Sequence, residues 1–359
     1  MLNAANNVSP APLTRGVNES NLPLVTFAVF AYNQEKYIKE AVESAFAQNY
    51  SPLEIIISDD GSSDKTFEII NSLVRNYRGL HHVRAVQTKS NEGIMSHVLS
   101  VVAQSNGALI IVAAGDDISY PNRAQTLFDS WGRSGAWALF SKFDRINQNG
   151  SMFASDCKLE SPNHTIRRCF RDKSEIQLIH GATSAYDRRV FSLLNHNCKG
   201  ILTEDGVMSF LLYCYGKDVN FVDESLVKYR SHPDALSNAV SKRFNIVRSE
   251  LRNDEEKAKK YAVAFVNLNT FFLKILEDLK VSRPILIDKI LKSEIENQIK
   301  YNLMVAGWVD AGFIGRLQFL LSSCRLDGIK WILPRLFGLS FFIRVKVFLN
   351  KFRRYLKLS

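Results

Sequence analysis

The stretch that decides the fold runs from Leu53 to Thr66 and reads Leu-Glu-Ile-Ile-Ile-Ser-Asp-Asp-Gly-Ser-Ser-Asp-Lys-Thr. Its first half is rich in β-branched residues, which is typical of a strand buried in a sheet. Its second half combines acidic and hydroxyl side chains with Gly61, a composition that favours a turn and the start of a helix. The stretch therefore predicts a strand, a polar loop and a helix. Taken alone, its polar half is explained as well by a helix cap as by a binding site.

The same succession of apolar runs and helical spacing repeats on both sides of this stretch. Further strands are predicted at 24–30, 83–86, 108–113, 137–143, 145–147 and 219–222. Helices are predicted at 38–46, 66–77, 94–103, 120–134, 188–194 and 204–215. Strands that alternate with helices form βαβ units, so we expect an α/β fold whose mostly parallel, Rossmann-like sheet is flanked by helices.

The composition and the hydrophobic pattern of the sequence change near both ends of the chain. Residues 1–22 are polar and rich in Asn, Ser and Pro, without the apolar core of a signal peptide, and we expect a disordered lead-in. Residues 23–240 carry the alternating pattern of a single sheet domain. From 241 to 359 the pattern becomes helical and charged, which predicts a helical C-terminal appendage.

Composition narrows the class of protein. The chain has 359 residues, of which 46% are hydrophobic and 23% charged, as in ordinary globular proteins. Its five cysteines are odd in number and form no Cys-x-x-Cys pair, which argues against a disulfide framework or a zinc site and favours a reducing compartment. No uncharged apolar run reaches the ~18 to 20 residues that span a bilayer.

The positive charge is concentrated at the C-terminus. The net charge is +10, and the segment from residue 335 to 359 contains no acidic residue and the basic residues Arg335, Arg344, Lys346, Lys351, Arg353, Arg354 and Lys357. The rest of the chain is therefore close to neutral. A nucleic-acid-binding protein would spread its basic residues over a folded face, so we expect no nucleic-acid partner and an anionic surface that meets the tail.

Polar clusters follow three of the predicted strands, where an open α/β sheet binds its ligands. They comprise residues 31–35, 59–66 and 115–117. The adjacent Asp116 and Asp117 would repel a phosphate, but they become favourable if a divalent cation such as Mg²⁺ or Mn²⁺ lies between carboxylate and diphosphate oxygens. A helix cap before Pro121 would explain this pair equally well. The joint appearance of the three clusters favours a binding site.

The ordered set of motifs resembles the family 2 glycosyltransferases, whose fold is called GT-A. The resemblance covers about residues 24–238, and its most specific element is Asp-Asp-Gly-Ser-x-Asp-x-Thr at 59–66. The other matching pieces are Tyr32-Asn33, Asn91-x-Gly93, Gly115-Asp116-Asp117-x-x-x-Pro121-x-Arg123, Glu204-Asp205 and Val227-Lys228-Tyr229-Arg230-Ser231-His232. One departure is Ala114, where many relatives carry an aspartate, and it bears on metal affinity and donor identity.

The resemblance implies a set of donor-site residues. A nucleotide-sugar donor would be lined by Ala31, Tyr32, Asn33, Glu35, Asp59, Asp60, Asn91 and Gly93. Within this set, Asp60 is the best candidate for a nucleobase contact, and Asp116 would face the ribose. Asp117 would hold a divalent metal against the diphosphate. His232 would add a metal ligand or a diphosphate contact, with Arg230 beside it, although a histidine in a loop is more often simply solvated.

The resemblance also implies a base that removes the acceptor hydroxyl's proton. Asp205 matches the family's base position, at the start of a predicted helix. A purely structural explanation is that Thr203 caps this helix while Glu204 and Asp205 favour its positive end, and both explanations can hold together. Gly181, Ala182 and Glu204 are expected to border the acceptor.

The basic tail has a physical interpretation of its own. Apolar residues of 341–356 recur at helical spacing, with basic residues on the opposite side. Such a helix suits the plane of an anionic membrane, although a helix packed on the catalytic domain is the alternative. We expect a cytoplasmic protein, peripheral on the inner face of the cytoplasmic membrane, and an acceptor that is a glycan or lipid-linked.

These features together predict an inverting, metal-dependent transferase of bacterial surface-polysaccharide synthesis, such as that of lipopolysaccharide, O-antigen or capsule. The main alternative is a nucleotide-sugar- or carbohydrate-binding protein of the same fold with weak or no catalysis, which Ala114 favours and Asp117 and Asp205 disfavour. A sugar nucleotidyltransferase would carry a Gly-rich phosphate loop after the first strand, and this chain has none. A receiver domain has no use for Tyr32-Asn33 or Glu204-Asp205.

Overall fold

A computed structural model of the protein describes residues 22–157, 179–196, 198–233, 235, 255–282, 292, 295, 296, 299, 300 and 303. The predicted lead-in before Leu22 and the basic tail at 335–359 lie outside the described residues. The chain divides into two compact units, of which the first combines Met1–Ala239 with Asn267–Glu296 and the second combines Val240–Val266 with Asn297–Ser359. The unit that contains the sheet thus also includes a segment that the sequence analysis assigns to the appendage.

Four parallel strands form one half of the sheet, in the order β3-β2-β1-β4. They are β1 (Val25–Ala31), β2 (Leu53–Asp59), β3 (His82–Gln87) and β4 (Leu109–Ala114). The connecting helices are α1 (Ile38–Phe46), α2 (Thr66–Asn76) and α3 (Ile94–Gln104). Ala31 pairs with Asp59 and Phe30 with Ala114, so the carboxyl ends of β1, β2 and β4 lie level with one another. The predicted parallel sheet is confirmed for this half.

The other half of the sheet is mixed, with the order β4-β8-β6-β9-β5. Its strands are β5 (Ile118–Ser119), β6 (Ala138–Asn147), β8 (Ala185–Asp187) and β9 (Val219–Ser231), with β7 (Met152–Cys157) paired to β6. β8 is antiparallel to both β4 and β6, whereas β9 runs parallel to β6 and antiparallel to β5. The strand predicted at 219–222 extends to Ser231, because β6 offers a pairing edge along its whole length.

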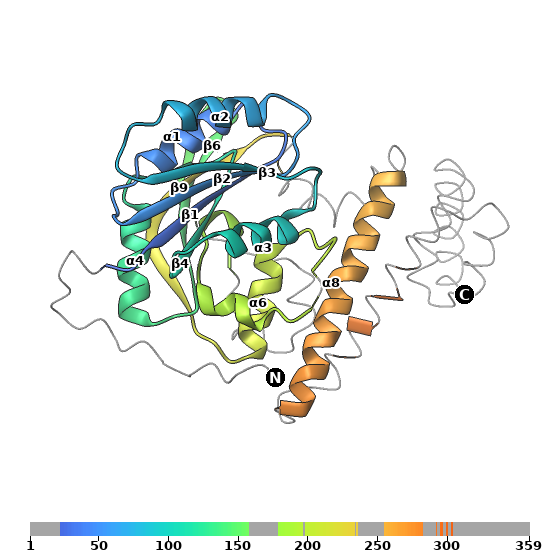
Figure 1. The fold of residues 1–359 in the computed structure, drawn as a ribbon. Coiled ribbons are helices and arrows are strands. Elements are labelled where there is room, and N and C mark those ends of the chain that lie inside the picture. Colours follow the sequence, from blue (N-terminus) through green and yellow to red (C-terminus); the bar gives the residue numbers. More distant parts are fainter. Residues whose placement is uncertain are drawn as a thin grey trace, which may run out of the picture. The chain divides into compact units, whose positions relative to one another are not determined.

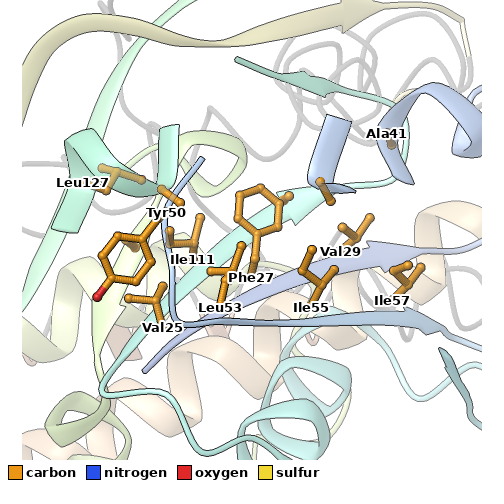
Figure 2. Packing of buried hydrophobic residues seen from close by; sticks show 14 of the residues in the cluster. Val25, Phe27, Val29, Ala41, Tyr50, Leu53, Ile55, Ile57, Ile111 and Leu127 are labelled. Atoms are coloured by element: carbon orange, nitrogen blue, oxygen red, sulfur yellow. The ribbon is translucent and has the colours of Figure 1, made fainter. Parts of the chain in front are cut away.

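The core lies between the sheet and the helices on one of its faces. β1 and β2 are buried along their entire length, as their mostly apolar sequences predict. Phe27, Val29 and Ile57 point to the face covered by α1, together with Ala41 (Figure 2). Complete burial of one such side chain contributes about 1.5–3 kcal/mol. Helices α1 and α2 lie on one face of the parallel half and α3 on the other (Figure 1).

The remaining described helices complete the layers. They are α4 (Arg123–Ser134), the 3₁₀ turns η2 (Gly181–Thr183) and η3 (Arg188–Leu193), α6 (Glu204–Cys214) and α8 (Glu255–Ser282). α6 packs against α3, and its Phe210 stacks on Phe272 of α8 with ring centroids 3.9 Å apart. No helix in the described part of the chain is both long and apolar enough to cross a membrane.

Candidate active site

The loops that follow β1, β2 and β4 are tied together at one edge of the sheet. The amide of Asp60 donates to the carbonyl of Ala31 (2.9 Å), and the amide of Gly115 donates to the carbonyl of Phe30 (2.8 Å). The polar clusters that the sequence places after three separate strands therefore meet in space. This edge is where parallel α/β sheets bind ligands.

Asn33 and Glu35 join the loop after β1 to the loop after β2. Asn33 adopts a left-handed backbone conformation (φ 52°), and its Oδ1 accepts from the amide of Ser63 at 2.9 Å. Glu35 Oε2 accepts from the amide of Lys65 (3.0 Å), while its own amide donates to Asp64 Oδ2 (3.1 Å). These two side chains thus hold the loops in place. Tyr32 beside them is 45% exposed, so its ring is open to a ligand.

Asp59 and Asp60 are buried and accept several internal hydrogen bonds. Asp59 Oδ2 accepts from the amide of Ser62 (2.9 Å) and from Gln87 Nε2 (3.0 Å). Asp60 Oδ1 accepts from Thr88 Oγ1 (3.1 Å) and the amide of Glu92 (2.9 Å), and its Oδ2 accepts from the amide of Gly93 (3.1 Å). A carboxylate has about four acceptor sites, so Asp60 keeps one for a ligand. Through these hydrogen bonds, Asp60 holds the loop at 88–93 in place.

Glycine is required at two points of this loop system. Gly61 has φ +68°, and a Cβ on it would lie 2.8 Å from the Cα of Ser90. Gly93 has φ +83° at the N-cap of α3. Both backbones lie in the left-handed region that L side chains avoid. Asn91, two residues before Gly93, is exposed.

The acidic pair after β4 is asymmetric. Asp117 is buried, and its Oδ1 accepts from the amide of Arg230 at 2.8 Å. Its Oδ2 is buried and has no hydrogen-bond partner. Burial, followed by the neighbouring charge of Asp116, raises the pKa of Asp117 well above its usual value. Asp116 Oδ2 lies 2.9 Å from Nε2 of His232, so the predicted ribose-facing residue and one predicted metal ligand contact each other.

This arrangement fits a divalent cation that completes its coordination with ligand oxygens. A buried carboxylate oxygen without a partner is costly unless a cation or donor meets it. In the described part of the chain, no three His, Cys, Asp or Glu side chains come close enough together to hold an ion. A cation at Asp117 would therefore need oxygen atoms from a bound molecule, as Mg²⁺ and Mn²⁺ accept from phosphates.

Arg230, which the sequence analysis places beside His232, is an internal residue. Its side chain is only 1% exposed and forms an ion pair with Glu40 of α1. Its Nε donates to the carbonyl of Asp116 at 2.8 Å. The guanidinium is therefore fully engaged inside the protein, and it does not face a ligand.

The predicted acceptor-side residues gather at the N-terminus of α6. Glu204 is buried, and a Cβ added to Gly181 would collide with its Oε1, so a larger residue there would force the Glu204 carboxylate to shift. Burial and the adjacent Asp205 raise the pKa of Glu204 to about 8. Burial also raises the pKa of Asp205, while the backbone amides of Gly206 and Gly181 counteract this rise. The amide of Gly206 donates to Asp205 Oδ1 at 2.7 Å.

The expected cap by Thr203 is not made. Thr203 is the N-cap residue of α6, but its side chain forms no capping hydrogen bond and its buried Oγ1 has no partner. Asp205 takes this role instead, because its carboxylate accepts a hydrogen bond from the backbone amide of Gly206 in the first turn of α6. The capping role and the proposed catalytic role thus fall on the same residue.

Arg123 connects the acidic pair to the acceptor side. It is fully buried at the start of α4, and its Nη2 donates to the carbonyls of Val112 (2.7 Å) and Ala182 (3.0 Å). The amide of Val112 in turn donates to the carbonyl of Ser184 at 3.1 Å. β4, which leads to Asp117, and η2, which borders Asp205, are therefore one hydrogen-bonded assembly.

Several residues of the site have no signal in the sequence. Glu40 resembles any exposed residue of an amphipathic helix, and Gln87 and Thr88 follow an ordinary strand. Tyr37 packs its ring 4.7 Å from that of His232 and beneath the guanidinium of Arg230. Their partners are distant in sequence, so only the fold reveals these contacts.

Comparison with known proteins identifies the class. Residues 26–194 match Glycosyl transferase family 2, and this domain belongs to that family. The chain is 33% identical to chondroitin synthase of Pasteurella multocida over 135 residues, which are 37% of this chain and 14% of that protein. An uncharacterized glycosyltransferase of Haemophilus influenzae is 23% identical over 305 residues, covering 79% of this chain and 85% of the relative. The chain thus matches only a small part of chondroitin synthase.

Among solved structures, TarS of S. aureus in complex with UDP-GlcNAc aligns with a TM-score of 0.49 and 14% identity, covering 89% of this chain and 80% of that one. The sheet with helices on both faces is the α/β fold predicted from the sequence, and residues 26–194 form its glycosyltransferase family 2 domain.

Proposed function

We propose that the protein is an inverting, metal-dependent transferase that moves a sugar from a nucleotide-sugar donor to a hydroxyl group of a glycan or lipid-linked acceptor. The observation that carries this proposal is the buried, unpartnered Oδ2 of Asp117 beside the Asp116–His232 pair. It lies after β4, among the loops that the family uses for the donor. The relatives named chondroitin synthase and hyaluronan synthase favour a role in polysaccharide synthesis, of the bacterial cell surface in this case.

The donor half of the site has distinct tasks for its residues. The exposed ring of Tyr32 offers a face to a nucleobase, and the remaining acceptor position of Asp60 suits a nucleobase N–H. Asp117 and His232 would hold Mg²⁺ or Mn²⁺ against the diphosphate, whose own oxygens would complete the coordination, and Asp116 would face the ribose. The bound metal would act as a Lewis acid that stabilises the negative charge of the departing nucleoside diphosphate. Asn33 and Glu35 would line the donor while they hold the loops after β1 and β2 together.

Asp205 is the proposed general base. Its carboxylate accepts the proton of the acceptor hydroxyl while the oxygen of that hydroxyl attacks the anomeric carbon, and the bond to the nucleoside diphosphate breaks on the opposite face. One displacement of this kind inverts the anomeric configuration. Burial raises the pKa of Asp205, which suits a group that takes up a proton, and the amides of Gly206 and Gly181 limit this rise.

The test is a screen of nucleotide sugars, with Mn²⁺ or with EDTA, for hydrolysis and for transfer to glycan and lipid-linked acceptors. Asp205→Asn should retain donor affinity and lose transfer by at least ~10²-fold, the low end for loss of a general base. Wild-type rates in this variant would place the base elsewhere. A wild-type protein that binds a donor but neither hydrolyses nor transfers it would favour the alternative of a binding protein, for which Ala114 is the supporting feature.

We also propose that the protein is cytoplasmic and peripheral on the inner face of the membrane through its basic tail. The support comes from the sequence: the tail has seven basic residues and no acidic one, and Lys346, Arg353, Arg354 and Lys357 recur opposite an aromatic and aliphatic face. Each cation near anionic lipid contributes about 1 kcal/mol. A lipid-linked acceptor would explain why the enzyme needs such a tail.

A further inference from the structure

The strand end that carries the proposed cation site is fastened to α1 through a single buried side chain. Arg230 lies near the end of β9, and its backbone amide donates to Asp117 Oδ1 at 2.8 Å. Its Nε donates to the carbonyl of Asp116, also at 2.8 Å. One residue therefore holds both members of the acidic pair, one through its carboxylate and the other through its main chain.

The other end of the same guanidinium is anchored in two further elements. Nη2 forms the ion pair with Glu40 of α1, and Nη1 donates to the carbonyl of Gln148 at 3.2 Å, in the turn between β6 and β7. The ring of Tyr37 lies beneath the guanidinium, with its centroid 4.9 Å from Cζ. The loop after β4, α1 and the turn between β6 and β7 thus all contact the guanidinium that β9 carries. The planar guanidinium has several donors in a fixed arrangement, which suits several fixed partners.

The orientation of Asp117 depends on this anchoring. The amide of Arg230 occupies Oδ1, so Oδ2 is the oxygen left for a ligand. If the guanidinium lost its partners, the end of β9 would shift and carry that amide with it. His232, which contacts Asp116 only two residues further on, would move as well.

We propose that the Glu40–Arg230 ion pair positions the acidic pair for cation binding, so that Glu40 acts on the metal site through Arg230 without touching it. This inference rests on the proposed function, because it assumes that a cation binds at Asp117. It assigns to Arg230 a positioning role. Groups that orient metal ligands typically change metal affinity or activity by about 10–100-fold when they are mutated.

The helix offers a matched control for Glu40. Glu43 lies on the same helix, and the side chains of both residues are 52% exposed. Glu43 forms only a surface pair with Lys39, 3.8 Å away. Glu40→Gln and Glu43→Gln therefore remove the same charge from the same helix at equal exposure, and only the first weakens the anchor of Arg230.

The experiment measures how strongly Mn²⁺ increases nucleotide affinity. UDP, GDP, dTDP, CDP and ADP are titrated calorimetrically into the full chain in Mn²⁺ and in EDTA, and the nucleotide that wild type binds most tightly is used for the variants. The readout is the ratio of the two dissociation constants. A general loss of stability would lower the melting temperature but leave this ratio unchanged, so it separates positioning from folding.

We expect Arg230→Lys to reduce the Mn²⁺ enhancement by at least about 10-fold. Glu40→Gln should reduce it by a smaller factor, and Glu43→Gln should match wild type. Because Arg230→Lys alters a buried residue and can impair folding, Glu40→Gln decides the outcome if that variant is insoluble. An unchanged ratio in Glu40→Gln overturns the inference and leaves the proposed function standing. A wild-type protein whose nucleotide affinity is the same in EDTA overturns the proposed metal site itself.

Discussion

The replacement of Asp60 by alanine distinguishes a residue that holds a loop from one that only contacts a ligand. The sequence predicts a nucleobase contact, whereas the structure shows three hydrogen bonds from Thr88 and from the amides of Glu92 and Gly93. These bonds join β2 to the loop that begins α3. Asp60→Ala removes the carboxylate that accepts all three hydrogen bonds and should therefore destabilise the protein even without a bound nucleotide sugar.

The size of this effect follows from the exposure of the donors. A hydrogen bond to a charged group contributes about 1.5–3 kcal/mol when it is fully buried. Glu92 is exposed and Thr88 and Gly93 are half-buried, so water replaces part of what is lost. We expect the free energy of unfolding to fall by about 2–3 kcal/mol, which corresponds to a melting temperature roughly 4–12 °C lower.

The assay combines thermal denaturation with calorimetric binding of the preferred nucleotide. Thr88→Val is the matched control, since it removes one donor and should cost about 1 kcal/mol. The double variant should lose less than the sum of the two single variants, because both remove the same hydrogen bond. If Asp60→Ala melts at the wild-type temperature and only loses nucleotide affinity, the carboxylate serves the ligand alone and the loop argument is wrong.

Three further predictions address the metal, the acceptor side and the tail. Asp117→Ala should abolish the Mn²⁺ enhancement of nucleotide binding and nearly abolish transfer, and full turnover in this variant or in EDTA would contradict the cation assignment. The pKa of Glu204 is raised to about 8, above the ~4.3 of an unfolded chain, so its contribution to stability is present below the lower value and is lost as the pH rises through the higher one. Glu204→Gln should therefore raise the melting temperature relative to wild type at about pH 9 but not at about pH 4, and equal differences at both pH values would count against a buried carboxyl. A chain truncated after Leu333 should no longer sediment with anionic liposomes yet still bind nucleotide, whereas sedimentation equal to that of the full chain would exclude the tail as the anchor.

Much of the parallel half of the fold is determined by local sequence. β1 and β2 are buried on both faces, and a strand in that position needs a mostly apolar sequence, which Leu53–Ile57 provides apart from Glu54. Polar residues cluster at the end of each strand and in the loop that follows it. Parallel strands place these ends at one edge, so the convergence of Asp59, Asp60 and Asp117 was predictable without a structure.

The strands of the mixed half were less predictable, because pairing with a neighbouring strand determines where they begin and end. The segment at 223–231 contains charged residues that weaken its strand pattern, yet β6 pairs with it in parallel as far as Ser231. That pairing brings Arg230 to the acidic pair and to Glu40, 190 residues away in the sequence. A sequence shows which side chains carry charge but not which charges meet. The amino-acid pattern thus determined that a polar, acidic site forms at the end of the parallel strands, because burial dictates local composition. Only the tertiary structure decided that Arg230 is buried inside that site, because long-range strand pairing places its partners around it.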